Sequence, residues 1–305
     1  MKRSVIDVLR RAFDNAVANW PLILIRIAEV VVLAGLVIGA VIAAVIPVLV
    51  SAGLNKFDFG NPENAMDLFA TLVVQHWMLI LYLLLLATVI LGVLIAVHSF
   101  VEGGSARVYI DGERVAGFRA FAVDRWWDGG RRHWWAIFWI YNLAWSVAGI
   151  VLLVPLALTI AGMLAASDVG PRLAVGCIGL AFTFLILIPM AILVGMWTQK
   201  AIVIRVARSI GAVESLRASR REIRLDFGRH LGVWLLLMVL SIIAAGVLSS
   251  VTMPFSFGSH IGGRDSIVPL LFAPVQIVMS VVQNALSAAM GAWFLAAFVA
   301  LTEER

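Results

Sequence analysis

Residues 72–101 read LVVQHWMLILYLLLLATVILGVLIAVHSFV and contain no Asp, Glu, Lys or Arg. A bilayer core about 30 Å thick is crossed by about 20 apolar helical residues, so this stretch is long enough to span a membrane. Five further apolar stretches qualify, at residues 21–50, 134–164, 173–197, 231–253 and 268–301. We therefore predict an all-α, polytopic membrane protein with six transmembrane helices, which form a single membrane domain over residues 1–305.

The composition supports this prediction. The 305 residues are 62% hydrophobic and 13% charged, with a mean hydropathy of +1.02, whereas an average soluble domain is about 45–50% apolar and about 25% charged. A soluble fold of this length could not bury so much apolar surface. The net charge of +5 then indicates a membrane surface, and not nucleic acid, as the electrostatic partner. Cys177 is the only cysteine, so we expect neither a disulfide nor a thiolate metal site, and no cofactor.

Basic residues alternate between the loops. Most of the 23 Lys and Arg residues precede the first span or lie between spans two and three and spans four and five, whereas the opposite side holds Lys56, Arg172 and Arg264. The positive-inside rule then places both termini in the cytoplasm. The first apolar run is longer than a signal-peptide h-region of about 7–15 residues, so we expect it to remain as an anchor. We predict a multi-pass protein of a bacterial cytoplasmic (inner) membrane.

Each odd-numbered span follows an amphipathic stretch. These stretches read VIDVLRRAFDNAVANWP from Val5, FRAFAVDRWWDGGRRHWW from Phe118 and VESLRASRREIRLDFGRHLG from Val213. Each odd span also carries a proline towards its outer end, at Pro47, Pro155 and Pro254. This pattern predicts three parallel repeats, residues 1–101, 102–210 and 211–305, each an interfacial helix followed by a transmembrane hairpin.

The third amphipathic stretch is the most basic. Leu216, Ile223 and Phe227 fall on one helical face, and arginines occupy the other. Interfacial helices of this kind attract anionic lipid by about 1 kcal/mol per basic residue. We predict a surface that binds anionic lipid or a partner protein, formed by Arg217, Arg220, Arg221, Arg224, Arg229, Arg131 and Arg132. The alternative is that these residues only determine topology and anchor the chain.

A family resemblance follows from the same region. The run GAVESLRASRREIRLDFGRHLGVWLLL from Gly211, together with a basic amphipathic helix before each hydrophobic hairpin, resembles the membrane domain of bacterial glycerophosphoryl diester phosphodiesterases. It also resembles the related YciC-like six-helix membrane proteins. The resemblance implies a six-helix inner-membrane bundle, largely without assigned activity. The phosphodiesterases add a soluble catalytic domain, to which no segment of this sequence corresponds, so the resemblance implies no catalytic residue here.

Polar residues inside the spans are the other candidates, since ionisable groups within a membrane have functional roles by default. Arg26 and Glu29 are three residues apart on one helical face and are close enough to pair. Gln276 and Gln283 share a face of the last span. These four form a possible intramembrane polar site. The alternative is structural, in which amides such as that of Asn142 bridge neighbouring helices and Arg26 and Glu29 neutralise each other.

Three functions remain open. The first is a non-enzymatic membrane module whose arginine-rich helices bind anionic lipid or a membrane-protein partner. The second is a transporter or lipid translocator with a polar path between repeats. The third is an enzyme acting on lipid headgroups at the cytoplasmic face, through Asp124, Asp128, His133, Asp226 or His230. The sequence contains no HExxH, GxxxxGK[ST] or GxSxG motif. We therefore favour the first function and predict no catalytic residue and no metal site.

Gly-Gly pairs occur at 103–104, 129–130 and 262–263. Glycine is a frequent residue of turns and helix ends. We therefore predict loop hinges or helix ends at these three positions.

Overall fold

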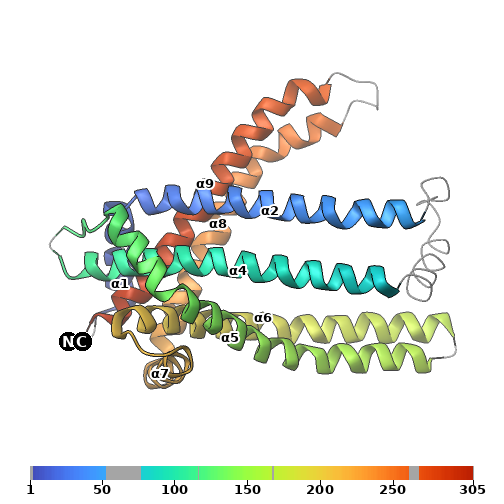
Figure 1. Ribbon diagram of the computed structural model, residues 1–305, viewed down its shortest axis with the longest axis horizontal. Coiled ribbons are helices and arrows are strands. Elements are labelled where there is room, and N and C mark those ends of the chain that lie inside the picture. Colours follow the sequence, from blue (N-terminus) through green and yellow to red (C-terminus); the bar gives the residue numbers. More distant parts are fainter. Residues whose placement is uncertain (1–2, 53–76, 116, 167, 261–267, 305) are drawn as a thin grey trace. The chain divides into compact units, whose positions relative to one another are not determined.

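The structure is a computed structural model that describes residues 3–52, 77–115, 117–166, 168–260 and 268–304. Over these ranges the chain forms eight helices and no strand (Figure 1). The helices are α1 (Val5–Ala18), α2 (Pro21–Ala52), α4 (Trp77–Glu113), α5 (Val123–Ala165), α6 (Val169–Arg208), α7 (Ala212–Leu225), α8 (Phe227–His260) and α9 (Val268–Thr302).

Six of these helices are long and apolar enough to cross a membrane: α2, α4, α5, α6, α8 and α9. Each overlaps one of the six predicted spans, and α4, α5 and α6 extend ten or more residues beyond their predicted spans at one end. Their large apolar side chains are exposed, as at Leu85 (63%), Leu158 (69%) and Leu185 (69%). Soluble proteins rarely expose contiguous apolar surface on this scale, because water does not solvate it favourably. Over the described residues, the prediction of an all-helical chain with six helices long and apolar enough to cross a membrane is confirmed.

The chain forms two compact units, Met1–Ile27 with Ser99–Arg305, and Ala28–His98. Within the second unit, the Tyr82 hydroxyl of α4 donates to the Ala43 carbonyl of α2 at 3.3 Å. Within the first unit, α5 packs against α6 and α8 packs against α9 as two hairpins (Figure 1). The two shorter helices join this unit, with α1 against α9 and α7 against α6.

The core of the first unit lies towards one end of its long helices. Tyr109 of α4, Ile137 of α5, Ile202 of α6 and Phe298 of α9 are all fully buried there. The remaining parts of α5 and α6 expose most of their apolar side chains. The unit therefore combines a closely packed base with hairpins whose surface suits hydrocarbon.

Two glycine pairs belong to this base and correct a prediction. Gly103–Gly104 lies inside α4 and Gly129–Gly130 lies inside α5. A Cβ atom on Gly104 would approach Trp126 to 2.6 Å, and one on Gly130 would approach Phe100 to 2.8 Å. The prediction of hinges or helix ends is wrong at these pairs, because their glycines allow two helices to cross closely. The third pair, 262–263, lies outside the described residues, as do Lys56 and Arg264.

The amphipathic stretches behave differently from one another. The first and third form separate helices, α1 and α7, as predicted. The second forms no separate helix, because residues 118–122 are non-helical and α5 then continues unbroken from Val123 to Ala165. The predicted interfacial helix is wrong there. Trp126, Gly129 and Gly130 of this stretch pack against α4.

Candidate lipid-binding surface

The helix α7 is fixed against α6 along one face. Ser215, Leu216, Ser219 and Ile223 form this buried face. The Ser219 hydroxyl donates to the Trp197 carbonyl at 2.9 Å, and the Trp197 indole N–H donates to the Leu216 carbonyl at 2.8 Å. Two small serines and a reciprocal pair of hydrogen bonds therefore set the distance and the rotation of α7.

A buried acid–base group secures the same helix. Glu222 of α7 accepts a hydrogen bond from Arg208 at 2.5 Å, and its other carboxylate oxygen lies 3.3 Å from the Lys200 ammonium. Lys200 is almost completely buried and also donates to the Thr302 hydroxyl at 2.9 Å. Buried charges require such partners. Position 200 follows the fourth predicted span, 173–197, whereas the structure places Lys200 inside α6, where it connects α7 with the end of α9.

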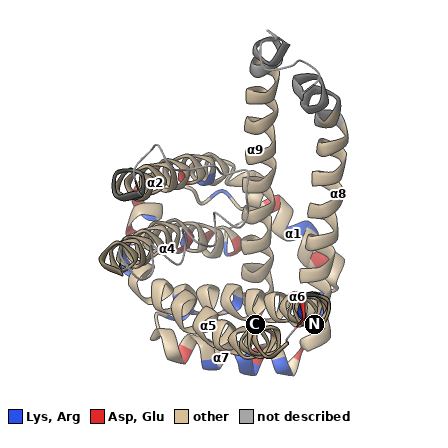
Figure 2. Cartoon of the chain, turned by 90° about the vertical axis from the view of Figure 1, so that its right-hand side faces the viewer, with Lys and Arg blue, Asp and Glu red and all other residues tan. Residues whose placement is uncertain are grey.

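The opposite face of α7 carries four exposed arginines, Arg217, Arg220, Arg221 and Arg224, at helical positions i, i+3, i+4 and i+7. With Leu225 they line a surface hollow of about 460 Å³. None of the four forms an ion pair with a residue that the structure describes. We call these four residues the α7 arginine face; the basic positions of α7 are blue in Figure 2.

The other three predicted arginines have acid partners. Arg131 and Arg132 of α5 lie 3.8 and 2.8 Å from the Asp128 carboxylate and remain exposed. The Arg229 side chain is only 12% exposed, and it forms a salt bridge with Glu304 and lies 3.6 Å from Asp226. The structure therefore separates the seven predicted residues into an unpaired set on α7 and a neutralised set elsewhere.

Pairing is common among the remaining basic side chains of the first unit. Glu113 forms salt bridges with both Arg3, at 2.9 Å, and Arg11. Arg114 donates two hydrogen bonds to Glu303, at 2.8 and 2.9 Å. This interaction with Glu303 raises the pKa of the Arg114 guanidinium. Charges held in this way are less available to an external anion than the α7 arginine face.

The predicted intramembrane residues have partners that the sequence interpretation missed. Arg26 donates to the Glu102 carboxylate of α4 at 2.9 Å, and both side chains are buried. In the second unit, the Glu29 carboxylate lies 2.6 Å from Nδ1 of His98. In the structural alternative given above, Arg26 and Glu29 neutralise each other. The partners shown by the structure are Glu102 and His98, which lie far away in the sequence.

Glu102 belongs to a polar stripe on α4, formed by Ser99, Glu102, Ser105 and Tyr109. All four side chains are buried, and their spacing of three or four residues places them on one face of the helix. The hydroxyls of Ser99, Ser105 and Tyr109 have no hydrogen-bond partner among the described residues. Buried hydroxyls are generally satisfied by ordered water when no protein group reaches them. No repeat or motif in the sequence indicated this stripe.

The amides lie apart from that stripe. Gln276 and Gln283 are exposed on α9. The residue of α9 beside Arg26 is Gly291, where a Cβ atom would lie 3.5 Å from the guanidinium. The Asn142 amide donates to the Phe138 carbonyl of its own helix at 2.8 Å. Among the described residues, the Asn142 amide therefore bonds a carbonyl one turn earlier in its own helix.

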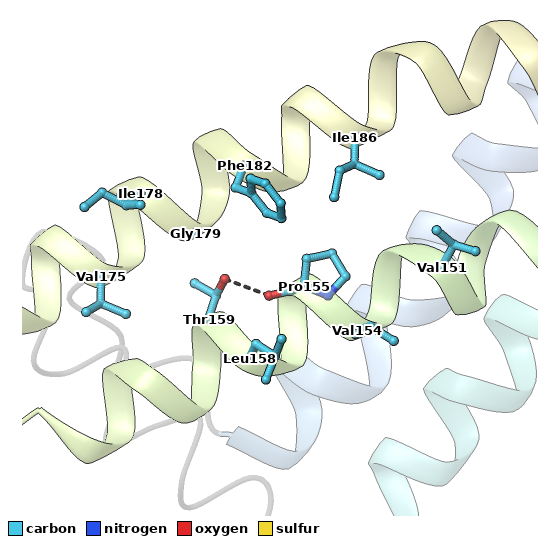
Figure 3. Close-up of a pocket in the computed structure, with 10 residues that line it drawn as sticks. All are labelled: Val151, Val154, Pro155, Leu158, Thr159, Val175, Ile178, Gly179, Phe182 and Ile186. Atoms are coloured by element: carbon cyan, nitrogen blue, oxygen red, sulfur yellow. Dashed lines mark hydrogen bonds between the residues drawn. The ribbon is translucent and has the colours of Figure 1, made fainter.

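A larger hollow, of about 720 Å³, lies between α5 and α6 (Figure 3). Its walls are apolar except for Thr159, whose hydroxyl donates to the Pro155 carbonyl at 2.8 Å. Gly179 allows the two helices to approach, since a Cβ atom there would lie 2.1 Å from the Thr159 hydroxyl. The one polar side chain is thus satisfied within its own helix, so this hollow suits a hydrocarbon chain better than a polar solute.

The candidate catalytic pairs do not form dyads. His230 Nδ1 lies 2.9 Å from the backbone carbonyl of Asp226, whose carboxylate faces Arg229. Asp128 is occupied by Arg131 and Arg132. A catalytic dyad requires a side-chain carboxylate on the imidazole. The described residues also contain no group of three or more His, Cys, Asp or Glu side chains that could hold a metal ion.

Comparisons with known proteins add no further constraint. No family model, curated protein or solved structure matches this chain.

Proposed function

We propose that this protein is a non-enzymatic integral membrane module that binds anionic lipid through the α7 arginine face. In this proposal it spans a bacterial cytoplasmic membrane with both termini in the cytoplasm, as the distribution of Lys and Arg favours. One observation carries the proposal. Four arginines share the exposed face of a helix whose other face is fixed, and they lack acid partners in the described part of the chain.

The α7 arginine face should contribute a substantial binding free energy towards anionic lipid. Each basic residue near an anionic membrane surface contributes about 1 kcal/mol, so four contribute about 4 kcal/mol, or roughly a 10³-fold preference. The interaction decays within a Debye length of about 8 Å at physiological salt. Because α7 is already held by Trp197 and Glu222, little ordering entropy opposes binding.

The test is lipid retention by the full chain in nanodiscs that contain phosphatidylglycerol and phosphatidylcholine. Native mass spectrometry would count the lipids released with the protein from each disc. We expect the variant Arg217→Gln, Arg220→Gln, Arg221→Gln, Arg224→Gln to lose most of its preference for phosphatidylglycerol. The preference should also fall as salt is raised.

A matched control removes the same charge elsewhere, through Arg10→Gln, Arg119→Gln, Arg131→Gln and Arg132→Gln. This control should retain most of the preference. If both quadruple variants retained phosphatidylglycerol as the unmodified protein does, the proposal would be overturned. If the α7 variant lost a co-purifying protein but kept its lipids, the surface would instead bind a protein partner.

We also propose the threefold parallel repeat, residues 1–101, 102–210 and 211–305. Its support is the likeness of α1 and α7, which both have 14 residues and both place an acid at the third helical position. The resemblance to the phosphodiesterase membrane domain and to YciC-like proteins is consistent with this proposal. Both ideas predict that a structure of such a relative would superpose on α7, α8 and α9.

A second candidate function is a polar path for a transported solute, favoured by the polar stripe of α4. Three buried hydroxyls without described partners, beside the Arg26–Glu102 pair, provide sites for ordered water. Reconstituted protein should then leak protons or small solutes into liposomes, and Tyr109→Phe with Ser105→Ala should reduce that leak. A sealed liposome with the unmodified protein would contradict the path.

A further inference from the structure

A third hollow, of about 460 Å³, lies where α5, α6 and α7 meet the start of α8. Its apolar walls include Val147 of α5, Leu193 and Trp197 of α6, and Phe227 of α8. Arg220 and Arg224 of α7 also line it. The volume falls within the range of about 300–1,000 Å³ typical of small-molecule sites.

The hollow is amphipathic. Val147, Leu193 and Phe227 are large apolar residues that remain about half exposed, on helices that carry the membrane-spanning segments. Arg220 and Arg224 are one helical turn apart, so their guanidinium groups extend from neighbouring positions. A paired set of guanidinium groups suits a phosphate, to which each donates several hydrogen bonds.

We propose that the α5–α6–α7 hollow is a specific site for one anionic glycerophospholipid molecule of the surrounding bilayer. The phosphate lies between Arg220 and Arg224, and one acyl chain follows Val147, Leu193 and Phe227. This inference rests on the proposed function and narrows it to two of the four arginines. Arg217 and Arg221 do not line this hollow and contribute only to the general positive field.

Charge and shape select this occupant. Arg220 and Arg224 have no acid partner within the described ranges, so a net negative headgroup is favoured over a zwitterionic one. A free phosphate or glycerol phosphate has no acyl chain, so it would make no contact with the apolar walls of the hollow. A bilayer lipid supplies both halves, because its chain is already in hydrocarbon when its headgroup reaches the arginines.

The test uses photoreactive phosphatidylglycerol with a diazirine in one acyl chain, incorporated in nanodiscs with the full chain. After irradiation, peptide mass spectrometry locates the crosslinks. We expect them on peptides that contain Val147, Leu193 or Phe227. Arg220→Gln with Arg224→Gln should reduce these crosslinks roughly 30-fold, since two basic contacts are lost. Arg217→Gln with Arg221→Gln removes the same charge from the same helix and should reduce them only severalfold.

A second pair of variants tests the apolar part of the hollow, which we propose holds the acyl chain. Leu193→Trp fills the hollow and should abolish the crosslinks, whereas Leu185→Trp, on an exposed part of α6 outside the hollow, should not. Thermal unfolding would verify that both variants fold. Addition of glycerol phosphate should not compete with the photoreactive lipid.

The outcomes separate the two proposals. Equal losses in the two arginine pairs, or crosslinks scattered over α5 and α6, would overturn the specific site while the α7 arginine face still bound anionic lipid. Equal crosslinking by a photoreactive phosphatidylcholine, or competition by glycerol phosphate, would also overturn it. If both arginine pairs and the quadruple variant kept the preference for phosphatidylglycerol, the proposed function would be overturned as well.

Discussion

The helices α1 and α7 are alike in length and pattern, yet their charges have different fates. Both have 14 residues, one buried face and an acid at the third position. In α1, the neighbouring Arg3 and Arg11 form salt bridges with Glu113 at the end of α4. In α7, the four arginines have no such acid among the described residues. Arg10 of α1 is also exposed and forms no ion pair among the described residues, so α1 offers a single unpaired arginine where α7 offers four.

The two helices also differ in what their polar residues stabilise. The Asn15 amide of α1 donates to the Tyr109 carbonyl at 3.0 Å. The Asn19 amide donates to the Phe118 carbonyl at 2.6 Å and accepts from the backbone N–H groups of Ala120 and Phe121. Phe118 has a φ of 58°, which is unfavourable for a non-glycine residue, so this clamp maintains a strained connection. Thus α1 organises the base, whereas α7 presents a surface.

The largest expected effect lies on the α1 side. Asn19→Ala would leave the Phe118 carbonyl and the backbone N–H groups of Ala120 and Phe121 without their partner. The free energy of unfolding should therefore fall by about 3 kcal/mol. Arg221→Ala on α7 should change it by less than about 0.5 kcal/mol. Thermal and denaturant unfolding in detergent would compare the two. A similar loss in both variants would remove the distinction between the helices.

Glu113→Gln should give α1 arginines that lack a close carboxylate partner, as the arginines of α7 do. The Glu113 side chain is 2% exposed, and its loss leaves Arg11 without an acid partner and leaves Arg3 with only Glu304, at 4.0 Å. We therefore expect a loss of about 2 kcal/mol in the free energy of unfolding. Retention of phosphatidylglycerol in nanodiscs should rise, because the Arg11 guanidinium becomes available and that of Arg3 is held less strongly. Unchanged retention would show that counter-charge does not decide which helix binds lipid.

Leu225→Glu should give the arginines of α7 a carboxylate partner, as Glu113 does for Arg11 of α1. Leu225 is exposed beside the arginines, one turn beyond Arg221, so a carboxylate there would neutralise part of the face. Retention of phosphatidylglycerol should fall roughly fivefold, as expected for about 1 kcal/mol. The control is Leu225→Gln, which changes polarity without charge. Equal retention by the two variants would count against an electrostatic surface.

The smallest effect concerns the start of α1. The Ser4 hydroxyl and backbone N–H donate to the Asp7 carboxylate at 2.6 and 3.2 Å, and these bonds lower the pKa of Asp7 below 3.8. Since the folded pKa is the lower one, the stabilisation is present above pH 3.8 and is lost as the pH falls through the folded value.

The corresponding variant is Ser4→Ala, which should lower the free energy of unfolding slightly at pH 7 and progressively less below pH 3.8. Unfolding measured across this pH range would show whether the difference closes. The matched change on α7 is Gly211→Ala, where no hydroxyl is lost and a Cβ atom meets Glu214 only at 3.9 Å. A constant difference between Ser4→Ala and the unmodified protein would exclude Asp7 as its cause.

The sequence predicted the parts of the fold that depend on local pattern. The length of the apolar stretches predicted the six spans. Helical periodicity predicted α1, α7 and the exposed positions of Arg217, Arg220, Arg221 and Arg224. It could not predict contacts between distant segments. Glu102 lies 76 residues from Arg26, and Gly104 appears as a hinge unless the ring of Trp126 is known to pack on it. Pairing of Arg229 with Glu304 was missed for the same reason.

The most direct test is the local lipid composition beside α7 and beside α1. A fluorophore would be attached to Leu225→Cys or to Ile6→Cys, both at strongly exposed positions (74% and 73%), in a Cys177→Ser background. Quenching would be compared between headgroup-labelled phosphatidylglycerol and headgroup-labelled phosphatidylcholine at equal mole fraction. We predict stronger quenching by phosphatidylglycerol at position 225 than at position 6, and loss of this excess in the quadruple arginine variant. Equal quenching at both positions by both lipids would contradict the account.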